Sequence, residues 1–375
     1  MNSAGIQLTL LAGPVVPIPA PRPIVEALDS VEVTSSAGSR SGFQLQFKVS
    51  NRSPLHTLLL VAGNQVPWLR VVIVVTLGGM PHVLADGVVT RQELGSADEA
   101  GESTLTVTGE DLTAVMDQQE FNGLPYPAMP VETRVLVILA KYALFGMIPL
   151  VVPSLFTDVP IPTSRIPTHR GTDLSYVNEL ARDAGYVFYV EPGPAPGTNT
   201  AYWGPEIRAG VPQPALNLGM DAHSNVESLQ FSIAQTDATL PLVFIQNPIA
   251  KFPIPLPVPS IDLLKPPLGL IPPGIRKIEL LKDTAKDSPM TALSKGLARA
   301  AGSQDAVRGE GSLDMLRYGR VLKARQLVGV RGAGLAFDGL YYVHRVTSRI
   351  RRGEFRQSFS LVRNGLVSTV PGVPA

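Results

Sequence analysis

Proline and glycine are the residues that most restrict the fold of this chain. The 375 residues include 35 prolines and 34 glycines, and proline is present at about twice its average share of roughly 5 %. Proline breaks helices and central strands, and the two residues together mark turns. The chain is therefore predicted to consist of short elements joined by many turns and ordered loops. Its length allows two or three domains.

Short runs with β-branched or alternating residues fill the stretch from about 28 to 110. They are VEVTSS, FQLQFKVS, WLRVVIVVTLGG, HVLADGVVTRQEL and STLTVTGEDL, and turn residues separate them. This spacing is typical of an antiparallel barrel or sandwich. Residues 28–130 are therefore predicted to form a first β-barrel domain, which ends with a short helix at EDLTAVMDQQ. Residues 1–27 are predicted to be an extended, Pro-rich N-terminal arm.

Residues 131–225 differ in character and are predicted to form a small α/β insert domain. ETRVLVILAKYALFG is predicted to be a helix that ends at Gly146. In GTDLSYVNELARDAG, Thr172 suits the N-cap of a second helix and Gly185 suits its left-handed C-terminal end. The apolar stripe of this helix consists of Leu174, Val177, Leu180, Ala181 and Ala184. Two aromatic strands, YVFYV and AYWG, follow it.

Residues 226–365 return to strand-like runs and are predicted to form a second β-barrel domain. The runs are VESLQFSIA, KIELLKD, RVLKARQLVGVRG, DGLYYVHRVTSRI and EFRQSFSLVRNG, and SPMTALSKGLARAAG is predicted to be a helix. The segment 241–274 is rich in proline and is predicted to be a long loop rather than a helix or central strand. Its apolar side chains are expected to pack on a neighbouring chain. Residues 366–375 are predicted to be a C-terminal tail.

The chain has few charges for its length. Charged residues make up 17 % and hydrophobic residues 45 % of it, whereas charged residues are roughly 25 % of an average soluble domain. Part of the apolar surface is therefore predicted to be covered in an assembly. The net charge of +1 provides no long-range attraction to nucleic acid. The absence of cysteine excludes disulfides and thiolate metal sites, and it suits a reducing cytoplasm.

Neither an export signal nor a membrane span is expected. The first twenty residues are apolar, but no positive side chain precedes Arg22 and prolines interrupt the stretch. The best candidate for a membrane span is 135–152, VLVILAKYALFGMIPLVV. Lys141 lies in its middle and Pro149 lies near its end, so a buried helix is favoured.

Residues that could carry out chemistry are scattered. The five histidines, which form no metal-binding pair at helical spacing, are His56, His82, His169, His223 and His344. GSRSG has Arg40 where a hydrolase would need serine, and GVRGAG (329–334) precedes a strand-like run rather than the helix of a dinucleotide site. The basic run RIRRGEFR (349–356) is interpreted as a solvated hairpin tip. No catalytic, cofactor-binding or metal-ligating residue is therefore assigned, and no cofactor is expected.

Four aromatic residues, Tyr186, Tyr189, Tyr202 and Trp203, gather within 171–205. Such side chains can stack on a sugar ring, but they are also common in cores and protein interfaces. A role in the core of the insert or in an interface is favoured.

Two stretches of the chain echo each other. DGVVTRQELGSADEAGE (86–102) and DGLYYVHRVTSRIRRGE (338–354) both open with Asp-Gly and close with Gly-Glu at the same spacing. An Asp-Gly step favours a tight turn with positive φ at glycine. The two β-domains are therefore predicted to be related, with Asp86–Gly87 superposing on Asp338–Gly339 and Gly101–Glu102 on Gly353–Glu354.

The stretch 171–205, GTDLSYVNELARDAGYVFYVEPGPAPGTNTAYWGP, resembles the central segment of the phage late control D family, the baseplate hub proteins of contractile tails. Residues 316–365 are similar to the closing barrel of the same family, and residues 84–112 match its first barrel more loosely. The resemblance covers about 28–365 and implies two related antiparallel β-barrel domains that flank a small α+β domain.

The resemblance also implies a function. Hubs of this family are homotrimers in which two barrels per chain provide six similar domains, so they adapt a three-fold central spike to a six-fold tail tube. The expected partners are a central spike protein, inner tube proteins and baseplate wedge proteins. The protein would assemble in the bacterial cytoplasm and become a component of the baseplate of a virion or a phage-tail-like particle. The insert would brace a subunit interface, and no enzymatic activity is implied.

Type VI secretion hubs continue into a β-helical spike, whereas this sequence ends at Ala375 soon after its last strand. The spike is therefore expected to be a separate polypeptide, as in a phage tail or an extracellular injection particle.

Two other functions stay open at this point. A tail-associated cell-wall-degrading enzyme would need two carboxylates roughly 5–10 Å apart in a cleft, and the sequence offers no obvious pair. A carbohydrate-binding module would need Tyr202 and Trp203 exposed on a concave face. The sequence leaves open the host, the cargo of the lumen, the spike partner, the partner of 241–274, and the choice between a phage and an injection system.

Overall fold

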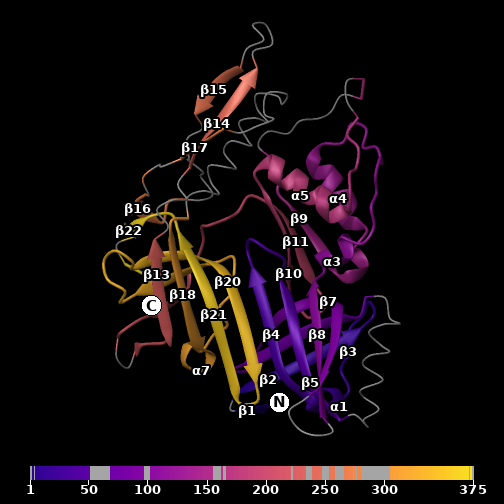
Figure 1. The fold of residues 1–375 in the computed structure, drawn as a ribbon, viewed down its shortest axis with the longest axis vertical. Helices are drawn as coiled ribbons and strands as arrows, with labels where there is room; N and C mark the ends of the chain where they lie inside the picture. Colours follow the sequence, from indigo (N-terminus) through magenta and orange to yellow (C-terminus); the bar gives the residue numbers. More distant parts are fainter. Residues whose placement is uncertain are drawn as a thin grey trace.

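The computed structural model confirms that the chain is mainly β, with few and short helices. It describes residues 2–3, 5–50, 68–96, 102–154, 162–163, 166–220, 223–233, 239–246, 253–257, 266–272, 274, 277–280, 305–370 and 372–373. The helix expected at 288–302 and His56 lie outside the described residues. Figure 1 shows a large curved sheet with a helical region beside its upper end.

Six main strands form the first β-unit. They are β2 (Ile6–Gly13), β4 (Leu28–Ser36), β5 (Gly42–Ser50), β6 (Arg70–Leu77), β7 (Met80–Ser96) and β8 (Glu102–Asp111). Their order in the sheet is β2-β6-β7-β8-β5-β4, and all neighbours are antiparallel. Alternation places one side of each strand in the core; in β5, for example, Phe43, Leu45, Phe47 and Val49 are buried.

The N-terminal segment 1–27 is not the separate arm that we predicted. Its strand β2 pairs with β6 along its whole length, and Ile6, Leu8 and Leu10 are buried in the core. The short elements β1 (Asn2–Ser3), β3 (Ile18–Pro19) and α1 (Arg22–Ala27) flank it. The apolar residues of β2 alternate, but the prolines that follow make the whole segment look irregular.

Six further strands form the second β-unit. They are β12 (Gln213–Asn217), β13 (Ser228–Ile233), β18 (Val307–Asp314), β19 (Leu327–Arg331), β20 (Gly339–Arg351) and β21 (Glu354–Arg363). Their order is β12-β19-β20-β21-β18-β13. The short helix α7 (Met315–Tyr318) connects β18 to β19, and β22 (Leu366–Ser368) follows β21.

The two units correspond strand for strand in both chain order and sheet order. The one difference in direction is that β2 is antiparallel to β6, whereas β12 is parallel to β19. The units are joined edge to edge, because β4 pairs with β20 from Ser30↔Arg351 to Ser36↔Arg345. All twelve strands thus belong to one sheet, and one hydrophobic core extends through both units. Among the described residues, no pairing closes either unit into a barrel of its own.

The insert has its own core and its own sheet. Its helices are α3 (Thr113–Met116), α4 (Val131–Ala140) and α5 (Asp173–Ala184), with a 3-10 turn η1 (Ala143–Phe145). Its strands β9 (Met147–Val151), β10 (Val187–Pro192) and β11 (Asn199–Gly204) pair in the order β10-β11-β9. Figure 1 shows the three helices packed on one side of this sheet.

Helix α5 follows the sequence prediction closely. The Thr172 hydroxyl accepts a hydrogen bond from the Ser175 backbone N–H at 3.2 Å, and Gly185 ends the helix with φ +73°. The apolar stripe faces the core of the insert, with Leu174, Val177 and Leu180 buried.

The helix predicted to end at Gly146 is divided into two pieces, and 135–152 is not a single buried helix. Helix α4 ends at Ala140, and Gly146 in the left-handed region (φ +70°) leads directly into β9. The segment also exposes apolar side chains: Leu144 is 80 % exposed, and Ile148 and Leu150 in β9 are 57 % and 51 % exposed. No described helix is both long enough and apolar enough to span a bilayer.

The Pro-rich segment 241–274 is not one continuous loop. It overlaps β14 (Thr239–Gln246), β15 (Pro253–Pro257) and β16 (Gly269–Ile271), and β14 is the central strand of a small sheet with β15 and β17 (Lys277–Leu280). Prolines 253, 255 and 257 alternate along β15, so residues with a backbone N–H lie between them and the pairing with β14 is possible. Contact of this segment with another chain stays a prediction.

Candidate functional site

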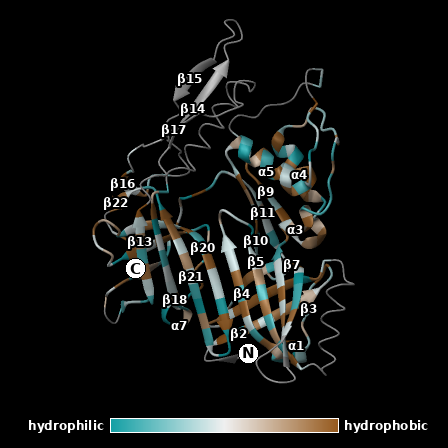
Figure 2. Ribbon diagram, in the orientation of Figure 1, coloured by the Kyte–Doolittle hydropathy of each residue, from teal (hydrophilic) through white to brown (hydrophobic). Residues whose placement is uncertain are grey.

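Each strand of the continuous sheet turns alternate residues away from the core. In β4, Val31 and Val33 are buried, whereas Glu32 and Thr34 lie on the opposite side and are partly exposed. We call this opposite side the polar face. It includes Ser228, Gln230, Glu310, Ser312, Arg345, Thr347, Arg349, Ser358, Ser360, Ser30, Glu32, Thr34, Gln44, Gln46, Thr104, Thr106 and Thr108. Figure 2 shows the resulting alternation of hydrophilic and hydrophobic bands along β4, β20 and β21.

Cross-strand pairing arranges the polar face in rows that run through both units. One row joins Ser228, Ser312, Ser358, Thr347 and Thr34. The hydroxyl oxygens of Ser228 and Ser312 are 2.9 Å apart, and those of Thr34 and Thr347 are 3.0 Å apart. Hydroxyl groups therefore connect the strands from β13 to β4 across the boundary between the units.

Several charges on the polar face form pairs of opposite sign. Arg349 Nε donates to Glu32 Oε2 at 2.8 Å, and Arg356 Nε lies 2.6 Å from Glu354 Oε1. These side chains are substantially exposed, so the pairs add little to stability. They do keep the face close to electrically neutral, which makes it a poor binding surface for a highly charged polymer.

Arg325 ties the two units and the insert together. It lies before β19 with φ +63°, and its Nη2 donates to the Ser36 carbonyl oxygen at 2.6 Å, at the end of β4. Its guanidinium group also lies 4.2 Å from the centre of the Tyr189 ring in the insert. One side chain of the second unit therefore contacts both other parts of the chain.

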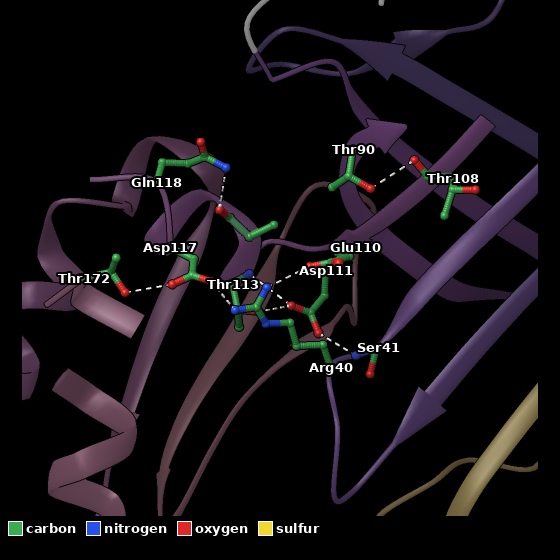
Figure 3. Close-up of polar contacts among 11 residues, drawn as sticks. Arg40, Ser41, Thr90, Thr108, Glu110, Asp111, Thr113, Asp117, Gln118 and Thr172 are labelled. Carbon is green, nitrogen blue, oxygen red and sulfur yellow. Dashed lines mark hydrogen bonds and ion pairs between the residues drawn. The ribbon is translucent and has the colours of Figure 1, made fainter. Parts of the chain in front are cut away.

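A polar cluster attaches the insert to the first unit (Figure 3). Arg40, just before β5, donates to Glu110 Oε2 at 2.9 Å and to Asp117 Oδ2. Asp117 Oδ1 accepts a hydrogen bond from the Thr172 hydroxyl at 2.7 Å. Burial acts to raise the pKa of Asp117, but the hydrogen bonds from Thr172 and Arg40 outweigh it, so the pKa is lowered. The start of α5 is thereby fixed to the first unit by a charged carboxylate.

Asp111 lies beside this cluster at the end of β8 (Figure 3). Its two carboxylate oxygens accept hydrogen bonds from the backbone N–H groups of Ser41 at 2.9 Å and Thr113 at 3.0 Å. Burial raises its pKa despite these bonds. Asp111 therefore joins the end of β8 to the start of β5 and to the start of α3.

A second, fully buried network lies at the other contact between unit and insert. Arg70 and Asp86 are joined by two hydrogen bonds of 2.7 Å, with side chains 2 % and 0 % exposed. Arg70 also donates to the carbonyl oxygens of Val15 and Gly197, both at 2.9 Å, and Asn199 Nδ2 donates to Asp86 Oδ2 at 2.9 Å. This ion pair fastens the N-terminal segment and the loop between β10 and β11 to the first unit.

The ionisable side chains of the insert gather around Asp173. Tyr142 donates to Asp173 Oδ2 at 2.6 Å, Lys141 pairs with the same carboxylate, and His169 Nε2 lies 3.5 Å from Oδ1. His169 and the Asp173 side chain are both 0 % exposed. Burial lowers the pKa of His169, which favours the neutral ring. A substrate in solution reaches neither His169 nor the Asp173 carboxylate without opening the insert, whereas the Lys141 side chain is 39 % exposed. The cluster is suited to hold α5 in place.

The aromatic group of the insert is largely internal. Trp203 is 0 % and Tyr202 is 6 % exposed, and the Tyr202 hydroxyl donates to the Pro205 carbonyl oxygen at 2.7 Å. Tyr186 packs edge-on against Trp203 at 4.8 Å, and Tyr189 stacks on Tyr202 at 5.0 Å. This arrangement agrees with the favoured interpretation as core, and it leaves no exposed tryptophan face for a sugar.

The other sequence motifs lie far apart. The first three residues of GVRGAG belong to β19, which is Leu327–Arg331. The basic run 349–356 covers the tip of the β20–β21 hairpin. His82 is in β7, His344 is in β20 and His223 is exposed in a loop. Within the described ranges, no three His, Asp or Glu side chains are grouped so as to hold a metal ion.

The internal echo is half right. Glu102 and Glu354 begin the corresponding strands β8 and β21, whereas Gly101 lies outside the described residues. When β8 is aligned with β21 at these glutamates, the pairing of each strand with its neighbour places the β-bulge at Thr90 in β7 on the β-bulge at His344 in β20. In this alignment Asp86 corresponds to Leu340. The Asp-Gly steps are thus two residues out of register, because the connection after β7 is longer than the Arg352–Gly353 turn.

The argument from turn chemistry is wrong for the first Asp-Gly. Gly87 lies within β7 and pairs with Asp111, and a Cβ there would be 2.0 Å from the Glu110 carbonyl oxygen. Close approach of β8 therefore requires this glycine. Of the two Asp-Gly glycines, only Gly339 has a positive φ, +131°. The buried role of Asp86 carried no local sequence signal.

Comparison with known proteins identifies the class of fold. No family model and no curated protein matches the sequence, but the structure is similar to solved tail proteins and type VI secretion components. The first is a tail protein from Neisseria meningitidis MC58, with a TM-score of 0.65, 13 % identity, and 97 % of this chain and 98 % of that chain covered.

A 43 kDa tail protein of prophage MuSo2 from Shewanella oneidensis has a TM-score of 0.60 and 14 % identity, with 95 % of this chain and 98 % of that chain covered. A component of the E. coli type VI secretion system has a TM-score of 0.56 and 12 % identity, with 92 % and 77 % covered. The resemblance to tail hub proteins seen in the sequence is therefore confirmed at the level of the fold.

Proposed function

We propose that this chain is the structural hub of a contractile tail or a tail-like injection particle. In this role a homotrimer joins a three-fold central spike to the six-fold inner tube, and wedge proteins surround it. The observation that carries the proposal is the strand-for-strand correspondence of the two β-units within one sheet. Three copies present six similar units, which is what a junction between three-fold and six-fold rings needs.

The polar face supports the same proposal. It is a continuous surface of hydroxyls, amides and paired charges that crosses both units. Turned inward in a ring, such a surface would line the lumen without holding a passing protein or nucleic acid tightly. The exposed apolar side chains of α4, η1 and β9 would be covered by a neighbouring subunit or a wedge protein; they include Leu136, Val137, Leu144, Ile148 and Leu150.

The experiment that tests this proposal is a reconstruction of the intact particle together with light scattering of the purified chain. We expect three copies in the hub layer and subunit interfaces of obligate size, roughly 2,000 Å² or more. One or six copies in that layer would contradict the proposal.

The proposed role is not enzymatic, and the burial of both His169 and the Asp173 carboxylate within the insert supports this. Incubation of the purified protein with peptidoglycan tests this point. Release of soluble fragments above the level of a heat-inactivated sample would favour a cell-wall-degrading enzyme instead.

A further inference from the structure

A groove lies at the end of the continuous sheet that is opposite the insert. The strand β2, the helix α1 and the turn between β20 and β21 form it. Figure 1 shows α1 and this turn at the lower end of the molecule, where the β4–β20 junction ends at the Ser30↔Arg351 pair. The groove has a volume of about 490 Å³, which is within the range of roughly 300–1,000 Å³ that is common for binding sites.

The floor of the groove is apolar. Ile6 and Leu8 of β2 and Ile350 of β20 reach it from the core that the two units share, and Val25 of α1 lies half-buried beside them. An apolar side chain placed on this floor would be removed from water together with the surface that it covers.

Two arginines at the rim lack a carboxylate partner. Arg351 and Arg352 are both exposed, and within the described part of the chain no carboxylate forms an ion pair with either of them. Arg352 Nη2 donates to the Glu26 carbonyl oxygen at 2.9 Å, which holds this side chain against α1. Both guanidinium groups therefore keep donors for a ligand.

The two glutamates of the groove are already engaged. Glu26 Oε1 accepts a hydrogen bond from Arg22 Nε at 2.7 Å, and Glu354 Oε1 lies 2.6 Å from Arg356 Nε. Since these carboxylates have their own partners, the positive charge of Arg351 and Arg352 stays available at the rim.

The backbone that carries the two arginines is fixed. Arg351 pairs with Glu354, so Arg352 and Gly353 form a two-residue turn, and Gly353 has φ +82°. A long antiparallel ladder supports this turn. The arginines thus stand on a rigid element, which limits the loss of backbone entropy when a ligand binds.

We propose that this groove binds an acidic peptide segment of another protein. An apolar side chain of the peptide lies on the floor, and a neighbouring carboxylate accepts hydrogen bonds from Arg351 and Arg352, which suit carboxylates in geometry and charge. A nucleic acid would use the arginines but would leave the apolar floor without a partner, so a peptide fits the groove better. Only the placement of that protein within the particle rests on the proposed function.

Fluorescence anisotropy with the purified full chain tests the proposal. The probe is the fluorescein-labelled peptide Gly-Asp-Leu-Glu-Leu-Asp-Gly. One control peptide replaces its acidic residues by their amides, and another replaces its leucines by serines. A labelled oligothymidylate serves as the nucleic-acid probe.

Two variants of the chain accompany the peptides. The test variant carries Arg351→Gln with Arg352→Gln. The matched control carries Arg170→Gln with Arg182→Gln, which removes the same charge from exposed positions of the insert. Circular dichroism and light scattering report the fold and the molecular mass of each variant.

We expect the parent chain to bind the acidic peptide at least about tenfold more tightly than the amide peptide, because hydrogen bonds to charged groups are the stronger ones. The serine peptide should bind more weakly as well. The test variant should lose at least about tenfold in affinity for the acidic peptide, whereas the matched control should bind it like the parent chain.

Several results would overturn the proposal and leave the hub standing. They are equal binding of the acidic and amide peptides, equal binding of the acidic and serine peptides, and an equal loss in the two variants. Tighter binding of the oligothymidylate would assign the rim to nucleic acid instead. A change of molecular mass in the test variant alone would assign the groove to a contact between copies. A hub layer without three copies, by contrast, overturns the hub and leaves the peptide site intact.

Discussion

Thr34 and Thr347 lie directly opposite each other in β4 and β20, with their hydroxyl oxygens 3.0 Å apart although 313 positions separate them in the sequence. This pair marks the place where the two β-units become one sheet. Since the same core extends behind it, the two units are expected to unfold as one.

A double-mutant cycle of Thr34→Val and Thr347→Val measures the coupling across this junction. Each single change leaves one hydroxyl facing a methyl group, whereas the double change restores a matched pair. We expect a coupling free energy of about 0.2–1 kcal/mol from urea unfolding curves, as for other cross-strand pairs. Purely additive single effects would show that the two hydroxyls do not interact.

Removal of one partner of the buried Arg70–Asp86 pair should be costly. Asp86→Ala leaves the Arg70 guanidinium, which is 2 % exposed, without its carboxylate, and the expected loss in the free energy of unfolding is about 3–5 kcal/mol. Glu26→Ala breaks the exposed Arg22–Glu26 pair and serves as the matched control, with an expected loss below about 1 kcal/mol. Equal losses in chemical denaturation would refute the structural role of Asp86.

Two glycines of β7 should respond differently to replacement by alanine. At Gly87 a Cβ would lie 2.0 Å from the Glu110 carbonyl oxygen, whereas at Gly95 the nearest atom is 3.9 Å away. We expect Gly87→Ala to lower the free energy of unfolding by about 1–3 kcal/mol or more, and Gly95→Ala to change it by less than about 0.5 kcal/mol. Thermal melting of the two variants beside the parent chain decides the point.

The buried His169 should make stability fall in acid. Burial lowers its pKa in the folded chain, and Asp173 only partly offsets this while Lys141 adds to it. The unfolded chain then binds the proton more readily. The contribution of neutral His169 is therefore complete above about pH 6.5 and is lost as the pH falls through the lowered folded value.

The stability difference between the parent chain and His169→Gln isolates this effect, because other histidines titrate equally in both. We expect this difference to shift toward the variant as the pH falls below about 6.5. The measurement is urea unfolding at a series of pH values. A difference that stays constant over the series would count against the buried neutral ring.

The sequence predicts best where its signals are local. The cap at Thr172, the stop at Gly185 and the apolar stripe between them lie within one helix, and the structure confirms all three. The alternation in FQLQFKVS likewise gives the buried positions of β5 correctly. A hydrophobic period and a capping residue need no knowledge of distant parts of the chain.

The failures all involve contacts between distant residues. Strand β2 depends on its pairing with β6, and β15 depends on its pairing with β14, which the alternation of its prolines permits. The helix end at Gly146 was predicted, but strand β9 after it depends on its pairing with the distant β11. Asp86 was assigned to a turn, and its partner Arg70 on the neighbouring strand shows why it is buried instead.

The connections 37–41 and 234–306 join corresponding strands, since β4 leads to β5 in the first unit as β13 leads to β18 in the second. The same position in the architecture thus accepts a short turn in one copy of the unit and a segment with a small sheet of its own in the other. The sheet does not depend on what is inserted there. Within the short turn, Arg40 and Ser41 belong to the polar cluster, so the natural grafting point is the exposed Ser39 just before them. A foreign peptide placed there would be displayed once per chain, at the position where the other unit carries its long insertion.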